Sequence, residues 1–161
     1  HDQIEAMTLA SKVGVMNAGV LPQIDTPKNI YNDPANLFVA GFMGSPSMNL
    51  ISGEVQDKTF QAPGCHYPSP TSEPGKKLVL GVRPEDTQIV SEGEHHLEGI
   101  IYSVELTGDQ TLVTVKQGEQ LITIREDKEF SASINESARI RMTTGRVFFF
   151  ESESGRRINA T

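Results

Sequence analysis

From Leu50 onward, short apolar runs alternate with turns that contain glycine, asparagine or aspartate. This spacing, about 8–12 residues from one run to the next, is typical of small all-β domains. The 14 glycines and 9 prolines also favour turns over long helices. The pattern predicts a mainly β fold, a small barrel or sandwich. The expected strands are Leu50–Val55, Lys77–Val82, Glu98–Leu106, Thr111–Lys116, Gln120–Arg125, Arg139–Thr143 and Val147–Glu151.

Two segments within this region depart from the alternation. Residues 62–77 hold four prolines and two glycines and have no apolar period, so they are expected to form a loop. The run Phe148-Phe149-Phe150 places Phe149 on one face of a strand and its neighbours on the other. Such an arrangement suits a core strand better than a platform on which bases stack.

Residues 1–45 have a mixed α/β pattern, which we interpret as a separate unit from residues 46–161. Apolar residues in Asp2–Ala10 recur near helical spacing. Residues 13–24 are typical of a β-hairpin, with a turn at 17–19. Thr26 and Pro27 have the residue types of a helix cap and a first helical position, and this helix is expected to end near Asn32. Residues 36–43 form a short, very apolar helix in this interpretation.

Charge and cysteine content exclude several classes of function. The net charge of -7 argues against nucleic-acid binding and against adsorption to anionic lipid. No stretch approaches the roughly 20 apolar residues of a membrane span. Cys65 is the one cysteine, so no internal disulfide forms, which fits a reducing compartment. The chain begins with His1 rather than Met, so we expect the biological start to lie upstream.

Several runs together resemble the maltose-type (carbohydrate uptake) family of ABC importer ATPases. They are the His1–Ala10 run, then Val15-Met16-Asn17 with Gly19, Thr26-Pro27 with Ile30-Tyr31 and Pro34, and Phe38–Pro46 with Met48-Asn49. Later, Leu80–Asp86 is similar to the signature of that family's regulatory domain, and Val104-Glu105 with Gly108 and Thr111-Leu112-Val113 is similar to the strand and turn that follow. The resemblance covers residues 1 to about 115. It implies that residues 1–45 are a remnant of the nucleotide-binding domain, and that residues 46–161 form a regulatory barrel of the oligonucleotide-binding (OB) type.

His1 matches the switch histidine of the family, which contacts the γ-phosphate and the attacking water. A neutral imidazole suits this role because it donates one hydrogen bond while its other nitrogen is held in place. However, this sequence has no Gly-x-x-x-x-Gly-Lys-Ser/Thr phosphate loop and no Leu-Ser-Gly-Gly-Gln run. The fragment is therefore not expected to be an enzyme or to bind a cofactor. ATP and Mg²⁺ would be cofactors of the full-length parent.

The motif Arg83-Pro84-Glu85-Asp86 has two interpretations. Pro84 favours an extended backbone at Arg83 and fixes the turn after the preceding strand. The motif is either a surface turn held by a salt bridge, or a structural signature that fixes the junction of the barrel or a subunit interface. Gly108 is the matching turn residue in the resemblance. The Arg83–Asp86 motif does not have the geometry of an active site in either interpretation.

His95 and His96, with Glu92, Glu94 and Glu98 nearby, have the composition of a metal site. Adjacent residues of a strand point to opposite sides, whereas the ligands of a tetrahedral site converge. We therefore expect a solvated loop and no metal site. The pair Cys65-His66 gives a similarly weak indication.

The resemblance implies a regulatory and dimerisation domain of an ABC transporter ATPase subunit that energises import of a sugar or similar small solute. The expected partners are a second copy in a homodimer, the transmembrane permease subunits in the parent and, in some members, a regulatory protein. Nucleic acid is not expected as a partner. The expected location is cytoplasmic, at the inner face of the bacterial membrane. A barrel that binds an oxyanion or small solute is the alternative, and the apolar segment Phe38–Met43 is expected to promote self-association.

Overall fold

The structure is a computed structural model and describes residues 12–159. The first described elements are the antiparallel hairpin of β1 (Val13–Asn17) and β2 (Val20–Asp25), followed by the short helices α2 (Pro27–Asn32) and α3 (Leu37–Phe42). All four were predicted from the sequence. The helix expected in Asp2–Ala10, and the candidate His1, lie outside the described residues.

Side-chain caps explain where the two helices begin. The Thr26 hydroxyl accepts a hydrogen bond from the Asn29 N–H (3.2 Å), and Pro27 occupies the first helical position. The Asn36 side chain accepts from the Val39 N–H (2.9 Å) in the same way. Because these contacts lie within three residues, they follow directly from the local sequence.

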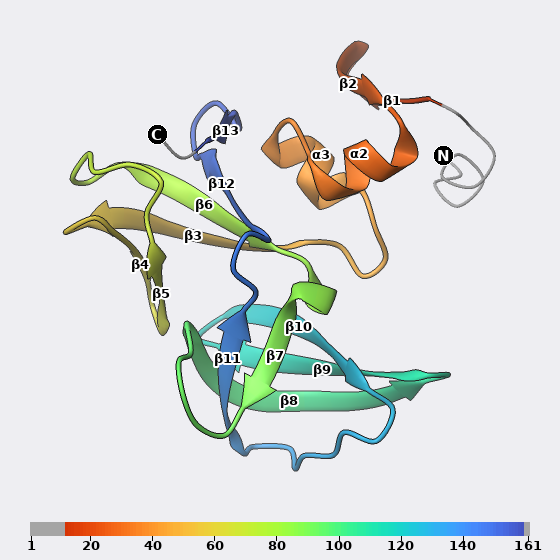
Figure 1. Cartoon of the computed structure of the whole chain (residues 1–161), viewed down its shortest axis with the longest axis vertical. Helices are drawn as coiled ribbons and strands as arrows, with labels where there is room; N and C mark the ends of the chain where they lie inside the picture. The colour runs from red at the N-terminus through yellow and green to blue at the C-terminus, as the bar shows by residue number, and fades with distance from the viewer. Residues whose placement is uncertain (1–11, 160–161) are drawn as a thin grey trace.

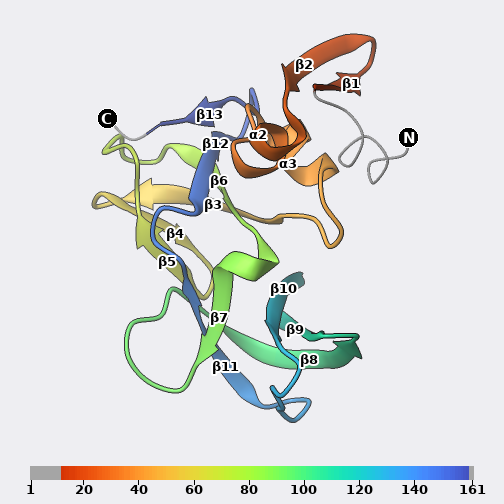
Figure 2. The ribbon, with the colours of Figure 1, turned by 45° about the vertical axis from the view of Figure 1, so that its right-hand side comes forward.

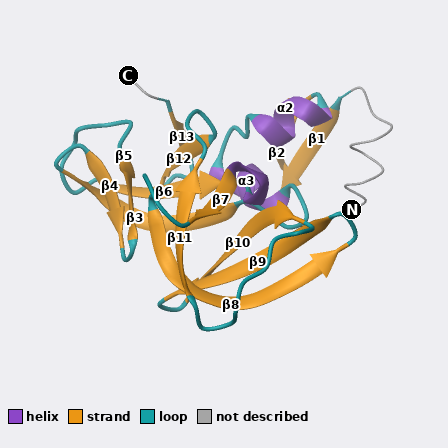
Figure 3. Ribbon diagram, turned by 60° about the horizontal axis from the view of Figure 1, so that its bottom comes forward, coloured by secondary structure: helices purple, strands orange, loops and turns teal. Residues whose placement is uncertain are grey.

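The strands form two lobes, shown one above the other in Figure 1. The upper lobe contains β3 (Asn49–Gln56), β4 (Thr59–Ala62), β5 (Cys65–Pro68), β6 (Lys77–Val82), β12 (Val147–Glu151) and β13 (Arg157–Ile158). The lower lobe contains β7 (Thr87–Val90), β8 (Leu97–Thr107), β9 (Gln110–Gln117), β10 (Gln120–Asp127) and β11 (Ser137–Met142). A single turn of 3₁₀ helix, η1 (Pro84–Asp86), connects β6 to β7. The mainly β fold is confirmed, and α2 and α3 lie beside the upper lobe (Figures 2 and 3).

All strand pairs of the two lobes are antiparallel, and within the described residues they form one continuous hydrogen-bonded network of eleven strands. Its main path runs β10-β9-β8-β5-β4-β3-β6-β12-β13, and β11 pairs with both β7 and β8. The lobes meet where β5 pairs with β8 at a single position, Cys65 opposite Leu97. This narrow connection makes the contacts around it important for how the lobes are held together.

The loop prediction for residues 62–77 is wrong in its first part. Residues 65–68 form β5, which pairs with β4 across a turn at Pro63-Gly64, where Gly64 has a φ of +65°. Pro68 stands at the end of the strand, so it removes no hydrogen bond from the middle of the ladder. Residues 69–76 do lie outside the strands.

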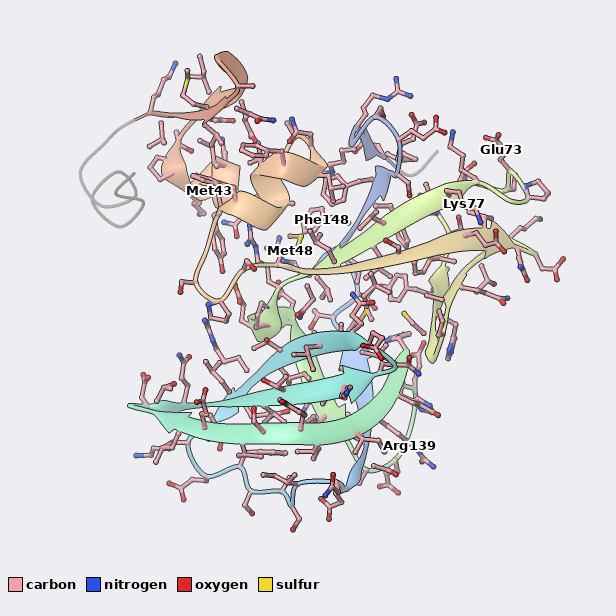
Figure 4. All side chains as sticks on the ribbon, turned by 180° about the vertical axis from the view of Figure 1, so that it is seen from behind. Met43, Met48, Glu73, Lys77, Arg139 and Phe148 are labelled. Carbon is pink, nitrogen blue, oxygen red and sulfur yellow. The ribbon has the colours of Figure 1, made fainter. Side chains whose placement is uncertain are left out.

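The described core has one cluster inside the two lobes, a second beneath α3 and a third between β1, α2 and α3 that contains Val15, Ile30, Val39 and Met43. The second contains Ala40, Met48, Val79, Phe148 and Phe150, whereas Phe149 belongs to the first. The predicted alternation of the three phenylalanines is therefore confirmed. Figure 4 labels Met48 and Phe148 in the layer between α3 and the sheet.

β10 is the strand at one end of the hydrogen-bonded path. Side-chain hydrogen bonds connect its free edge to β3 and β7. Asn49 of β3 makes two hydrogen bonds with the Thr123 backbone, donating to its carbonyl (2.8 Å) and accepting from its N–H (2.9 Å). Gln120 donates to the Leu50 carbonyl, and Glu126 accepts from the Ile89 N–H (2.7 Å). Side chains thus satisfy backbone groups that a neighbouring strand would otherwise satisfy.

Candidate functional site

Arg83 lies at the end of β6 and is fully buried, with 0% of its surface exposed. Its extended backbone, which Pro84 favours, precedes the turn of η1. The guanidinium donates from Nη1 to the Met43 carbonyl (2.6 Å) and from Nη2 to the Tyr31 carbonyl (2.9 Å). Met43 caps the C-terminus of α3 and Tyr31 lies in the last turn of α2. One cation thus binds the carbonyl ends of both helices, where the backbone carries partial negative charge.

The Tyr31 side chain adds a second contact to the same arginine. The Arg83 guanidinium lies 4.0 Å from the centroid of the Tyr31 ring, a cation–π geometry. Burial lowers the pKa of Arg83, and its electrostatic interactions with Tyr31 and Glu85 oppose that shift. An arginine keeps its proton under such conditions. The buried charge therefore depends on the two carbonyls and the ring for compensation.

The two acids of the motif bind different elements. Glu85 accepts a hydrogen bond from the Tyr31 hydroxyl (2.5 Å) and lies 3.8 Å from Arg125 of β10. Burial, followed by the bond to Glu85, raises the pKa of Tyr31 to about 12, so its hydroxyl stays a donor. Asp86 lies 3.5 Å from Arg146, and burial raises the pKa of its carboxyl while Arg146 opposes that shift.

Two further arginines reach the end of α2 and the residue that follows it. Arg146 donates to the Asn32 side chain (3.2 Å). Arg157 of β13 pairs with Asp33, and its guanidinium lies 4.7 Å from the centroid of the Phe148 ring. These contacts and those of the motif define what we call the junction, which comprises Arg83, Glu85, Asp86, Arg146 and Arg157 on the barrel side, and Tyr31, Asn32, Asp33 and Met43 on the helix side.

The structure brings the four residues of the predicted motif together and separates them from Gly108, the other predicted site residue within the described chain. Arg83 is buried instead of lying in a surface turn, so that interpretation is wrong for it. Gly108 lies in the turn between β8 and β9 with a φ of +65°, and no atom lies within 4 Å of the place where a Cβ would stand. A left-handed backbone at that turn explains the glycine, and Gly108 has no part in the junction.

The expectation of a solvated loop at His95-His96 is wrong for His96. Only 5% of His96 is exposed, because β5 and β11 pack on either side of its ring. Cys65 is buried as well, and burial raises the pKa of its thiol to about 12. Among residues 12–159, no group of three or more His, Cys, Asp or Glu side chains has the geometry to hold a metal ion.

Sequence reasoning missed the partners of the junction. Tyr31, Asp33, Arg146 and Arg157 lie 52 to 124 positions away from the residues they contact. No local pattern marks such residues. Only the fold shows that the end of α2 meets arginines from the C-terminal part of the chain.

In the part of the chain that the structure describes, no helix has the length and apolar character needed to cross a membrane.

Two protein families match this chain. Residues 44–87 match the MalK OB fold domain, and residues 80–150 match the TOBE domain. The chain is 34% identical to the sn-glycerol-3-phosphate import ATP-binding protein UgpC of Escherichia coli (strain K12), and 38% identical to that of Pectobacterium atrosepticum. Each comparison covers 98% of this chain and 46% of the relative, so the chain spans about half the length of the curated relatives it matches.

A solved structure shares the fold. The cytoplasmic molybdate-binding protein ModG, solved with molybdate bound, superimposes with a TM-score of 0.51 over 63% of this chain and 94% of its own. Its sequence identity of 16% limits the comparison to the fold.

The OB and TOBE domains therefore meet at η1, where the Arg83–Asp86 motif stands in both matched ranges. The similarity to the UgpC proteins extends from there to nearly the whole chain. This chain belongs to the maltose-type family of ABC importer ATP-binding subunits, and corresponds to the part of them that carries the OB and TOBE domains.

Proposed function

We propose that this chain is the regulatory and dimerisation part of an ATP-binding subunit that energises import of a sugar or similar small solute. The observation that supports this most is the junction. Arg83 fixes the carbonyl ends of α2 and α3 to the barrel, so the short helical part and the OB and TOBE domains are held in one orientation. Such a connection suits a module that transmits its state to a catalytic domain.

The proposal includes the rest of the subunit. Binding and hydrolysis of ATP with Mg²⁺ would belong to its nucleotide-binding domain, with His1 as the switch histidine. The fragment alone would not hydrolyse ATP. Permease subunits would contact the full-length protein at the cytoplasmic face of the membrane, and a regulatory protein would bind the barrel in members that have one.

The lower lobe presents a surface for a second copy. Ile100, Lys116 and Leu121 lie in one cross-strand row on its outer face, opposite to the row formed by Ile101, Val115 and Ile122 in the core. Ile100 and Leu121 are 43% and 50% exposed, and Tyr102, in the bulge of the same strand, is 56% exposed. Exposed apolar side chains grouped in this way are typical of association surfaces.

Replacement of Leu121 by Asp tests this surface. We expect the wild-type chain to sediment as a dimer and Leu121→Asp to shift it toward monomer, because a charge in an apolar contact loses its water. Analytical ultracentrifugation over a concentration series measures the change. The matched control is Phe38→Asp in α3, where Phe38 and Phe42 stack with 37% and 44% exposure. Dissociation by Phe38→Asp alone would assign the dimer contact to α3 and contradict the proposal.

A second candidate function is the binding of a small oxyanion. A surface pocket of about 420 Å³ is lined by Lys116, Ser137 and Arg139, together with Glu98. Within the described chain, neither Lys116 nor Arg139 has an ion pair within 4.0 Å. Two cations beside a hydroxyl are suitable for a tetrahedral anion, although Glu98, opposite Arg139 in the strand pairing, reduces the positive charge of the pocket. ModG, which has a similar fold, binds molybdate.

Calorimetric titration with molybdate, sulfate and phosphate tests this second function. Saturable heat that Arg139→Gln abolishes is the expected result if the pocket is a site. Arg156→Gln, at an exposed arginine of the upper lobe, serves as the matched control. The absence of saturable heat with all three anions would exclude oxyanion binding in this pocket.

A further inference from the structure

His96 lies next to the pairing of Cys65 with Leu97, the boundary between the two lobes that we call the seam. It forms hydrogen bonds with strands on both sides of this boundary. Its backbone carbonyl accepts from the His66 N–H of β5 (2.9 Å), and its backbone N–H donates to the Ile140 carbonyl of β11 (2.8 Å). Its ring Nδ1 accepts from the Met142 N–H (2.9 Å) and thus continues the pairing of β11 beyond the start of β8. One residue therefore connects the upper lobe to β11 through three hydrogen bonds.

These bonds fix the protonation state of the ring. The Met142 N–H is a donor, so Nδ1 must be unprotonated to accept from it. The proton of the neutral ring then lies on Nε2, which faces Glu94 at 3.2 Å. A second proton on Nδ1 would place two donors against each other and leave the Met142 N–H without its acceptor in a buried place.

The surroundings of the ring oppose its protonation on balance. On β5, Tyr67 contacts the ring at 4.8 Å and the His66 ring lies 6.3 Å away. In the loop that precedes β8, His95 pairs with Glu98 and the carboxylate of Glu94 is exposed.

On β11, Arg141 donates to the carbonyls of Glu92 and Glu94. Burial lowers the pKa of His96, with His66 and His95 acting in the same direction and Glu94 opposing them.

We propose that His96 is a pH-sensitive hydrogen-bonded link between the two lobes. When the ring is neutral, it holds the start of β8 against the end of β11. When it gains a proton in mildly acidic solution, the Met142 bond breaks and the seam at Cys65 and Leu97 loosens. The folded state favours the neutral ring, so its contribution to stability is complete above the pKa of an unfolded histidine, near 6.5, and declines as the pH falls below that value.

Amide hydrogen exchange of Met142, followed by NMR in the full chain between about pH 7.5 and about pH 5.5, tests the proposal. After correction for the intrinsic dependence of exchange on pH, we expect protection of Met142 to fall severalfold on acidification. Core amides such as those of Val113 and Ile124 in β9 and β10 are expected to keep theirs. A pH-independent protection of Met142 would overturn the proposal without the need for any variant.

Two variants assign the effect to one ring. Asn has an oxygen where histidine has Nδ1, so His96→Asn keeps an acceptor that does not titrate. We expect it to retain protection of Met142 at both pH values. His95→Asn, in the same loop, is the matched control and is expected to show the wild-type pH dependence. Persistence of the pH dependence in His96→Asn, or its loss in His95→Asn, would contradict the assignment to His96.

Discussion

Replacement of Arg83 by methionine is expected to lower the free energy of unfolding by about 3 kcal/mol. Methionine keeps most of the buried volume but provides no donor, so the Met43 and Tyr31 carbonyls lose their partner in a place without water. The contact of the guanidinium with the Tyr31 ring is lost as well. Removal of a desolvated charge offsets part of this cost, which is why we expect a loss smaller than the sum of the contacts. Urea denaturation followed by circular dichroism measures it.

Two further variants make the result specific to the junction. Arg139→Met changes an exposed arginine of the lower lobe (Figure 4) and is expected to alter stability by less than about 0.5 kcal/mol. Arg83→Lys keeps the charge but not the two-pronged geometry, so we expect an intermediate loss. Limited proteolysis of Arg83→Met is expected to cut first within residues 26–43, because α2 and α3 lose their attachment. A methionine variant as stable and as resistant as the wild type would show that the junction does not depend on Arg83.

The elements predicted correctly are those whose causes lie within a few residues. Thr26 and Pro27 specify the start of α2 wherever that helix packs. The period of two in Phe148-Phe149-Phe150 assigns the faces of β12 without knowledge of its neighbours. Such signals survive folding because tertiary contacts reinforce them.

The predictions that were wrong concern features that depend on distant partners. β5 contains His66 and Pro68, which have little preference for strands, and it exists because β4 and β8 pair with it. His96 is in a polar run that suggests exposure, but β5 and β11 close over it. The composition of a segment cannot report which strands will cover it.

The Arg83–Asp86 motif could be located but not interpreted from the sequence. Its position after a strand and the effect of Pro84 on the backbone could be predicted because both depend only on neighbouring residues. Its partners on α2 are more than 50 positions away, as the bond from Arg83 to the Tyr31 carbonyl shows. In the structure, η1 contacts α2 through Glu85 and β10 through the same carboxylate, which faces Tyr31 and Arg125. A short motif therefore connects the helical part to both lobes.

The attachment of β10 to β3 depends on a residue that no sequence pattern singles out. Asn49 is only 7% exposed, and its amide matches both backbone groups of Thr123, with the nitrogen donating and the oxygen accepting. Asn49→Asp keeps the acceptor but replaces the donor with a second oxygen directed at the Thr123 carbonyl. We expect a loss of about 3 kcal/mol at neutral pH, from repulsion and from the burial of a charge.

The pH dependence of this loss separates it from a simple packing defect. Burial beside a carbonyl raises the pKa of the introduced carboxyl in the folded state, because its protonated form donates to the Thr123 carbonyl as the amide does. The folded state then binds the proton more tightly than the unfolded state, so the variant approaches wild-type stability as the pH falls through about 4 and loses it as the pH rises. Urea denaturation of both proteins from neutral pH to about pH 4 measures the difference, with Asn17→Asp at the exposed end of β1 as the matched control. A loss that stays constant over this range would mean that the donor of Asn49 is not what attaches β10 to β3.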